Sequence, residues 1–586
     1  MHRFRAVYQG KAQFLGQGFA ALALIGLSSA PLAGQTWSKA AVGYDMLQQR
    51  LGSSLPTGNG GVISQVEASN SAGAYYVDGS SPQFNGTFDP TSTPVTFTDG
   101  SFGAGNGVTG HATNTVGARY FGDTDSLAPG ANEVVLYSAA HWLSDIIKYN
   151  GSATPEAQDY RVQNHSWVHT LAPVPPAPQP PPQPFIEHAD NVKVLKRFDY
   201  LIETANGGTG MTAVVGLNNN ANPLPYLLSH SYNAIAVGKT DGIHSSGLTL
   251  GPDATPPDNT YGPGRSKPDI VAPLPSTSAA SAVVSSAATL LYDAVEGTDA
   301  SNNEVIKSML LAGATKNEFS SWNRSSTQPL DDAFGAGELN IYNSYLIQLG
   351  GQHEGTIGVP ATAAPSYGWD YQDRKSDALV GDLLYKFEVP TGSTAQELSI
   401  VLAWNAEITD TDPNGGFSPS LSLQNLDLQF YDAGGALIDE SISTVDNVEH
   451  LYFTNLTPGS YTLKVNNAAG WDFGLAWRTK TQFDQISADF NGDGSVDGAD
   501  FLLWQLNLGK LAGASAGEGD ADGDGDVDGD DLSAWRSGII ATTPALIVAS
   551  AIPEPATGVL AAMVILTLLY RARAQCFSAT RCEAVR

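Results

Sequence analysis

The distribution of apolar residues changes near residue 345, and this change is the feature that most constrains the fold. Between residues 60 and 345, short apolar runs such as 212–215 alternate with helical stretches such as 192–203. This alternation predicts an α/β domain, a doubly wound parallel sheet with helices on its faces. Residues 381–479 instead hold short alternating strands between Gly, Asn and Pro turns, which is typical of an all-β sandwich. A chain of 586 residues is also too long for one core, because cores stop growing near about 250–300 residues.

The chain therefore divides into segments with different expected structures. We expect a signal peptide at 1–34, an α/β domain at 55–348 with a proline-rich insertion at 173–184, a β-sandwich at 355–482, a small α-helical module at 486–540 and a C-terminal signal with a hydrophobic helix at 552–574. The insertion is almost entirely proline, alanine and glutamine, which predicts a polyproline-type surface excursion.

Charge and cysteine content exclude several classes of site and partner. The formal net charge of −30 argues against nucleic acid or an anionic membrane surface as a partner. The only cysteines are Cys576 and Cys582, so the body of the chain can hold neither a disulfide nor a cysteine-based metal site.

Both ends of the chain carry patterns typical of processing signals. Arg3, Arg5 and Lys11 precede an apolar run and then small residues up to Gly34, which predicts a signal peptide and export. Near the other end, residues 556–570 are apolar and uncharged, and they lie between a Pro-Glu-Pro motif at 553–555 and the basic sequence 571–573. A stretch of this length is short for a bilayer, which needs about 20 residues.

The order of motif, apolar stretch and arginines in this tail resembles the PEP-CTERM sorting signal of Gram-negative bacteria. The resemblance implies that the helix anchors the protein transiently and that a membrane transpeptidase cleaves near the Pro-Glu-Pro motif. The expected location is therefore the cell surface or outer envelope, or the medium after release.

A candidate nucleophile lies at the start of a helix that is rich in small residues. The sequence Lys-Pro-Asp-Ile-Val-Ala-Pro at 267–273 is followed by Ser-Thr-Ser-Ala-Ala-Ser at 276–281. A serine at a helix N-terminus lies where main-chain N–H groups can meet a developing oxyanion. The stretch resembles the nucleophile segment of the subtilases, the subtilisin-like serine peptidases, and Ser278 is the matching serine. It departs from the family pattern at Ser276, usually glycine, and at Ala282, usually proline.

Upstream segments supply the partners that a serine nucleophile needs. The stretch Gly-His-Ala-Thr-Asn-Thr-Val-Gly at 110–117 resembles the histidine segment of subtilases, which makes His111 the general base. The family places an aspartate at the end of the first strand, and this chain has Glu67 there. A glutamate can orient an imidazole, although its extra methylene demands a shifted backbone or rotamer.

Two further segments follow in the family order. The stretch Gln-Asn-His-Ser-Trp at 163–167 resembles the strand that binds the main chain of the substrate, and Ser166 is the expected contact. The segment Val-Val-Gly-Leu-Asn-Asn-Asn at 214–220 resembles the one with the oxyanion-hole asparagine, for which Asn218 fits best and Asn219 is the alternative. The resemblance as a whole implies a serine endopeptidase that acts on polypeptides.

Two acidic loops of twelve residues predict calcium binding. The first offers oxygen ligands from Asp489, Asn491, Asp493, Ser495, Asp497 and Asp500, and the second from Asp520, Asp522, Asp524, Asp526, Asp528 and Asp531. The seventh residue of each loop would bind through its main-chain carbonyl, and Gly494 and Gly525 at the sixth position allow a sharp turn. The pair of loops, each followed by a short helix, resembles a type I dockerin. The resemblance implies a cohesin-like domain as partner.

The sequence leaves two other functions open. A subtilase fold without efficient turnover would act as a surface or adhesion protein that only binds. A dockerin-bearing component of a polysaccharide-degrading assembly would need paired carboxylates in a cleft, and no convincing pair is visible in the sequence.

Overall fold

The computed structural model describes residues 37–86, 94–101, 107–168, 188–225, 227–249, 261–360, 362–373, 381–412, 414–467, 470–483, 488–493, 495–511, 513–522 and 525–542. The expected signal peptide, the proline-rich insertion and the C-terminal hydrophobic helix lie outside these residues.

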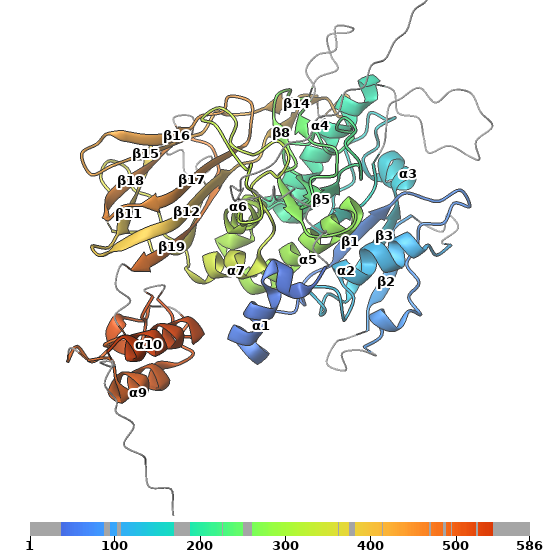
Figure 1. Ribbon diagram of the computed structural model, residues 1–586. Helices are drawn as coiled ribbons and strands as arrows, with labels where there is room; N and C mark the ends of the chain where they lie inside the picture. Colours follow the sequence, from blue (N-terminus) through green and yellow to red (C-terminus); the bar gives the residue numbers. More distant parts are fainter. Residues whose placement is uncertain are drawn as a thin grey trace, which may run out of the picture.

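A seven-stranded, fully parallel sheet forms the centre of the N-terminal domain (Figure 1). In spatial order the strands are β2 (Thr96–Asp99), β3 (Glu133–Ser138), β1 (Ile63–Glu67), β4 (Val162–His165), β5 (Thr212–Gly216), β6 (Ile235–Lys239) and β9 (Ile270–Ala272). On one side of β1 the chain runs outward through β4, β5, β6 and β9, whereas on the other side it forms the edge strand β2 first and then returns to β3 beside β1. The parallel α/β sheet that the sequence predicts is present. A sheet of this kind has its switch point beside β1, where ligand sites form at the carboxyl ends of strands.

Helices cover both faces of the sheet. They are α1 (Tyr44–Leu51), α2 (Ala118–Tyr120), α3 (Ala139–His141), α4 (His188–Thr204), α5 (Thr277–Val295), α6 (Asn303–Gly313) and α7 (Ile341–Leu349), and a helical segment at His111–Gly117 leads into α2. Alternate residues of a strand point to opposite faces. Ile63 and Val214 accordingly pack in the core with α5 and α6, whereas Val66 and Val215 pack in the core with α4.

Helix α5 is the central helix of the domain, and it starts beside the candidate nucleophile. Its side chains are almost all buried, because alanine, valine, leucine and small hydroxyl residues occupy every face. Among the described residues it is the one helix long and apolar enough to cross a membrane, and 89% of that apolar window is buried inside the protein. Helix α5 is therefore a core helix.

The second domain consists of two packed antiparallel sheets, as the sequence predicts. One sheet contains β10 (Tyr367–Gln372), β19 (Phe473–Phe483), β12 (Ser393–Ala403) and β17 (Val448–Leu456), and the other contains β11 (Leu383–Val389), β18 (Gly459–Asn466), β15 (Asp427–Tyr431) and β16 (Leu437–Ser441). This domain also contains the short pair β13 (Glu407–Asp410) and β14 (Pro419–Ser422). Another short pair, β7 (Gly247–Leu248) with β8 (Ser266–Lys267), belongs to the N-terminal domain. Aromatic side chains such as Trp477 and Phe430 fill the space between the two sheets.

The sandwich shares its core with the α/β domain. Strands β12 and β19 pack against α6, and their residues Val401, Ala403 and Ala476 belong to the same apolar cluster as α5 and α6. The Arg478 guanidinium crosses the boundary: Nε donates to the carbonyl of Ala312 at 2.9 Å. The two domains therefore form one packed unit.

A small helical module follows the sandwich. Helix α9 (Gly498–Asn507) and helix α10 (Gly529–Thr542) each begin at the tenth position of one of the acidic loops. A small core that includes Phe490, Trp504 and Val527 holds the two halves together.

Candidate functional site

Glu67 and His111 form the best-defined polar pair at the carboxyl end of the parallel sheet. Glu67 is the last residue of β1 and is 2% exposed, and its Oε2 lies 2.7 Å from Nδ1 of His111. Gln65 fixes the other carboxylate oxygen, because its Nε2 donates to Oε1 of Glu67 at 2.9 Å and to the carbonyl of Ala112 at 3.2 Å. The glutamate side chain therefore reaches the imidazole.

The pair has the electrostatics of an oriented base. Burial raises the pKa of Glu67, and the hydrogen bonds from His111 and Gln65 oppose that rise. The hydrogen bond with Glu67 raises the pKa of His111, and burial of the ring opposes it. When Nδ1–H donates to the carboxylate, Nε2 is left with the lone pair that can accept a proton. Part of this ring is open to solvent, since the His111 side chain is 44% exposed.

Ser278 lies in the first turn of α5 and is half-buried. Its Oγ donates to the carbonyl of Ser166 at 3.4 Å, which is a long contact, and the described residues contain no hydrogen bond between Ser278 and His111. Ser166 in turn donates from its own Oγ toward the carbonyl of Ser278 at 3.0 Å. These two hydrogen bonds connect the residue after β4 to the start of α5. The Ser278 hydroxyl points to the carbonyl of Ser166 and not to His111.

The two departures from the subtilase pattern both fit the start of α5. Ser276 caps the helix, because its Oγ accepts a hydrogen bond from the N–H of Ala279 at 3.2 Å. Ala282 is completely buried within the helix. Since alanine keeps the main-chain N–H and adds little volume, α5 continues through this position without a break.

The asparagines after β5 approach the nucleophile in different ways. Oδ1 of Asn219 accepts hydrogen bonds from the N–H of Thr277 at 2.7 Å and from its Oγ1 at 3.1 Å. With Oδ1 used in this way, Nδ2 is the donor group of Asn219, and Asn219 lines the same cavity as Ser278. Asn218 is held through its backbone, with its N–H donating to Oγ of Ser245 at 3.1 Å.

A cavity of about 70 Å³ lies against the nucleophile. It is lined by Ser166, Trp167, Val168, Gly216, Leu217, Asn218, Asn219, Thr277 and Ser278. The structure thereby brings Ser166, Asn218 and Ser278, which the sequence analysis singled out in three separate segments, to one place.

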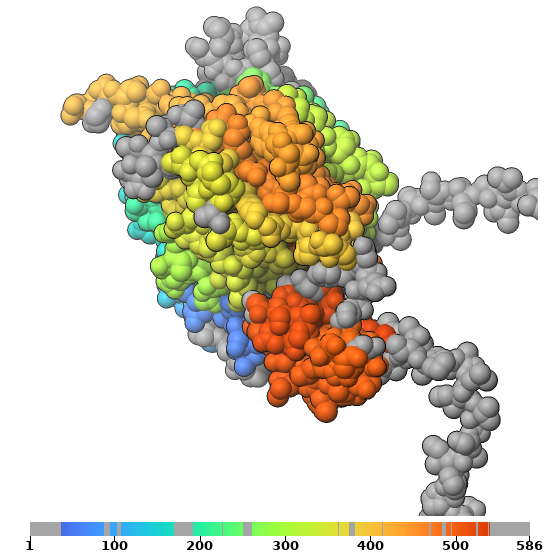
Figure 2. Space-filling view, turned by 90° about the vertical axis from the view of Figure 1, so that its left-hand side faces the viewer, coloured from blue at the N-terminus to red at the C-terminus, as the bar shows by residue number. Residues whose placement is uncertain are grey.

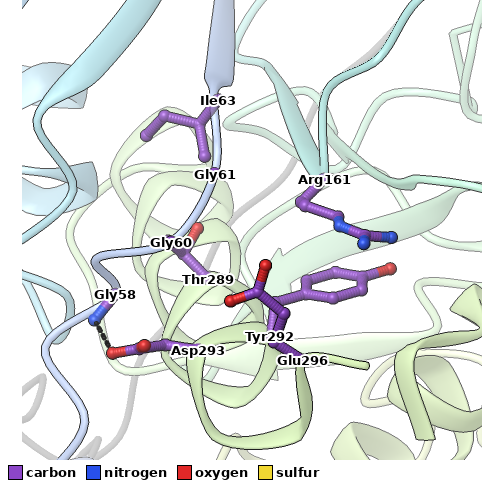
Figure 3. A pocket seen from close by; sticks show the side chains of 9 residues that line it. All are labelled: Gly58, Gly60, Gly61, Ile63, Arg161, Thr289, Tyr292, Asp293 and Glu296. Atoms are coloured by element: carbon purple, nitrogen blue, oxygen red, sulfur yellow. Dashed lines mark hydrogen bonds between the residues drawn. The ribbon is translucent and has the colours of Figure 1, made fainter. Parts of the chain in front are cut away.

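A second cavity lies at the opposite end of α5 (Figure 3). Its lining includes Asp293, whose Oδ2 accepts the N–H of Gly58 at 2.9 Å, and Arg161 beside the ring of Tyr292. The volume of about 20 Å³ has room for about one water molecule. The cavity lies at the amino end of β1 and is separate from the Glu67–His111 pair.

Hydrogen bonds to a buried carboxylate close each acidic loop in the parts that the structure describes. Each buried carboxylate at position 12 closes its loop: Asp500 accepts the N–H of Asn491 at 3.1 Å, and Asp531 accepts the N–H of Ala521 at 2.6 Å. Gly525 has a φ of +87°, so the sixth position takes the turn that requires glycine.

Carboxylates of the second loop come within reach of a single ion. One group contains Asp520, Asp522 and Asp531, and the other contains Asp526, Asp528 and Asp531, with ligand oxygens within 4.8 Å of one another in each group. The donor atoms are all oxygens, which suits Ca²⁺. Asp524 and Gly494 lie outside the described residues.

Comparison with known proteins gives only distant likenesses. No family model matches the sequence, and no curated protein matches it. Among solved structures, the patellamide maturation protease PatA is similar at 14% identity and a TM-score of 0.30, over 49% of this chain and 97% of that chain. The serine protease MycP1, an essential component of the type VII (ESX-1) secretion system, is similar at 14% identity and a TM-score of 0.27, over 54% of this chain and 90% of that chain. Likenesses this weak carry no statement about activity, so function is inferred from the site itself.

Proposed function

We propose that the chain is an exported serine endopeptidase of the subtilisin-like class. The observation that carries the proposal is the contact of 2.7 Å between buried Glu67 and His111, at the same end of the sheet as the half-buried Ser278. A carboxylate, an imidazole and a hydroxyl in this order form the acid, base and nucleophile of a serine hydrolase.

In the proposed reaction, Oγ of Ser278 attacks the carbonyl carbon of the scissile peptide bond. His111 accepts the hydroxyl proton at Nε2, and Glu67 stabilises the imidazolium that forms. The C–N bond then breaks as His111 returns the proton to the leaving amine. Water, deprotonated by His111, then attacks the acyl carbon, and His111 returns this proton to Oγ of Ser278 as the ester bond breaks and the acid leaves. The first step requires the Ser278 hydroxyl to turn from the Ser166 carbonyl toward His111.

We assign the side-chain donor of the oxyanion hole to Asn219, the alternative that the sequence leaves open beside Asn218. The support is the bond from Thr277 N–H to Oδ1 of Asn219, which leaves Nδ2 as the end that can donate. The N–H of Ser278, in the first turn of α5, is the second donor. Ser166 and the neighbouring cavity would hold the substrate beside the scissile bond.

Hydrolysis of a disordered protein substrate by the purified chain in Ca²⁺ tests this proposal. We expect turnover that Ser278→Ala abolishes and that Ser308→Ala, a matched change buried in α6, retains. A folded, calcium-replete chain without turnover would instead favour the subtilase-fold surface or adhesion protein that only binds.

We further propose that the helical module binds two calcium ions and a cohesin-like domain. The ligands would be Asp489, Asn491, Asp493, Ser495, Asp497 and Asp500 in the first loop, and Asp520, Asp522, Asp524, Asp526, Asp528 and Asp531 in the second. The exposed leucines Leu502 and Leu506 on α9, one turn apart, offer an apolar surface for a partner. Isothermal titration with Ca²⁺ after chelation should give two sites per chain, and Asp489→Ala should remove one of them.

Export, cleavage of a signal peptide and transient anchoring through the C-terminal helix remain part of this proposal. They rest on the sequence patterns at the two ends. Mass spectrometry of the N- and C-termini of the chain from its native host would test both processing steps.

A further inference from the structure

Arg50 joins three parts of the chain that are far apart in sequence. It lies in the last turn of α1, and its side chain is 9% exposed. Nη1 donates to the hydroxyl of Tyr342 on α7 at 2.7 Å, and Nη2 donates to the carbonyl of Leu511 in the helical module at 2.8 Å. The same guanidinium forms an ion pair with Asp526. One buried cation therefore contacts both the α/β domain and the module.

The partner of Arg50 in the module is a residue of the second acidic loop. Asp526 is at the seventh position, where the main-chain carbonyl is the expected calcium ligand and the side chain is available for another contact. Its carboxylate is 4% exposed, and one of its oxygens lies within 4.8 Å of carboxylate oxygens of Asp528 and Asp531. The geometry of the loop and the contact with Arg50 are consequently coupled.

The surface around this ion pair is loosely packed. Figure 2 shows the module, in orange and red, seated beside α1, in blue. Between the module and the rest of the chain lies a cavity of about 370 Å³, whose lining includes Leu346, Tyr367 and Leu511. Beside this cavity, Arg50 connects α1 to the module with a hydrogen bond to Leu511 and an ion pair with Asp526.

We propose that the module docks on the α/β domain through Arg50 and that calcium in the second loop controls this docking. The inference rests on the calcium assignment proposed above. Without calcium, the seven aspartates between residues 520 and 531 repel one another, and the loop loses the shape that presents Asp526 to Arg50. With calcium, the loop is ordered and the module is held against α1 and α7.

Docking has a consequence for partner binding. The exposed face of α9 with Leu502 and Leu506 is not among the residues that line the interface cavity. A docked module would present this face in a fixed orientation relative to the peptidase domain. In chelator, the same face would no longer be held in that orientation.

Hydrogen–deuterium exchange on the full chain tests the inference. In Ca²⁺ the amides of α1 should be protected, and Arg50→Glu or chelation should speed their exchange by about tenfold or more. Asp526→Asn should act in the same way as Arg50→Glu, because it removes the ion pair without touching α1. Arg536→Glu, the same charge change on an exposed position of α10, should have no effect on α1.

The exchange of α9 separates docking from calcium binding. For Arg50→Glu in Ca²⁺ we expect α9 to stay protected while α1 loses protection, which shows a folded but released module. Equal exchange of α1 in the parent chain, in chelator and in both interface variants would overturn the inference. Failure of Ca²⁺ to protect α9 in the parent chain would overturn the calcium assignment and the inference with it. Neither result would bear on the assignment of Ser278 as the nucleophile, which is tested by turnover.

Discussion

The carboxylate of Glu67 lies 2.7 Å from Nδ1 of His111, and the residue carrying it is 2% exposed at the end of β1. Serine peptidases of the proposed class have an aspartate in this role, so the longer side chain has to be accommodated. Gln65, two residues earlier on the same strand, donates to Glu67 and to the carbonyl of Ala112 next to His111. It thereby positions both members of the pair.

Substitutions of Glu67 should show whether turnover requires a carboxylate that orients His111 or only a polar side chain at this position. We expect Glu67→Gln to lower kcat/KM by about 10³–10⁴, because the amide favours the wrong tautomer of His111. Glu67→Asp keeps the charge but withdraws it by one methylene, so it should lose much less, on the order of tenfold. Steady-state kinetics on one peptide substrate measures both, and a fully active Glu67→Gln variant would refute the role of Glu67.

The pH profile should report the same pair. His111 acts as a base only when it is neutral, and its hydrogen bond with Glu67 raises its pKa from the ordinary 6.5. The rate should therefore fall on the acid side with a midpoint above 6.5. In Glu67→Gln the residual activity should have its midpoint at lower pH, because the neutral amide no longer favours imidazolium. An unchanged midpoint in that variant would show that the carboxylate does not act on His111.

The two neighbouring asparagines should differ in their effect on turnover. Loss of one oxyanion donor costs about 10²–10³ in kcat, so we expect this loss for Asn219→Ala with little change in KM. Asn218→Ala should have a much smaller effect, since the contacts of Asn218 with Ser245 are made by its backbone. The opposite ranking would return the role to Asn218.

Arg478, which contacts Ala312 across the boundary between the two domains, also forms a buried ion pair with Glu397, and we expect this pair to stabilise the fold. Nη2 of Arg478 donates to Oε1 of Glu397 at 2.5 Å. Burial alone would raise the pKa of Glu397, but Arg478 holds it at about 2, below the ordinary value of 4.5. The pair therefore contributes stability above pH 4.5, and this contribution is lost as the pH falls toward 2.

Urea unfolding of Glu397→Gln measures this contribution. We expect a loss of about 3–5 kcal/mol in the free energy of unfolding at pH 7, and a flatter decline between pH 4.5 and 2. Glu388→Gln, which breaks an ion pair of two more exposed side chains with Lys386, should cost less than about 1 kcal/mol. Equal losses for the two variants would contradict a buried role for Glu397.

The fold classes of both large domains could be predicted from the sequence because their strands have clear apolar periods. Strand β2 and helix α6 were not predicted. Strand β2 pairs only with β3 at the sheet edge, and its four residues are half-buried or exposed, so it carries no apolar run. Every residue of α6 is buried, so it lacks the one-sided pattern by which a helix is recognised.

The packing of the sandwich against α6 of the α/β domain was not predicted either, although the sequence contains a pattern that indicates it. Residues 381–479 were expected to hold the short alternating strands of a β-sandwich, without contact to the α/β domain being predicted. In the structure Leu402 faces the sandwich core, whereas Val401 and Ala403 belong to the core with α6. The unbroken apolar run at the end of β12 is the mark of a strand that is covered on both sides.

The candidate site could be predicted as far as residue types and order allow. Glu67 and His111 were expected partners, and they are in contact. The choice between Asn218 and Asn219 could not be made from three consecutive asparagines, because it depends on how the backbone turns after β5. The contacts of Arg50 could not be predicted from the sequence, because its partners Tyr342 and Leu511 are 292 and 461 residues away.

Labelling with a fluorophosphonate tests the central claim most directly, because the probe reacts with an activated serine and needs no knowledge of the substrate. Folded chain in Ca²⁺ at neutral pH should gain one adduct, located at Ser278 by tandem mass spectrometry. Ser278→Ala should abolish the adduct, and His111→Ala and Glu67→Gln should slow its formation strongly. A folded, calcium-replete chain that gains no adduct, or gains one equally well as Ser278→Ala, would contradict the assignment of Ser278 as the nucleophile.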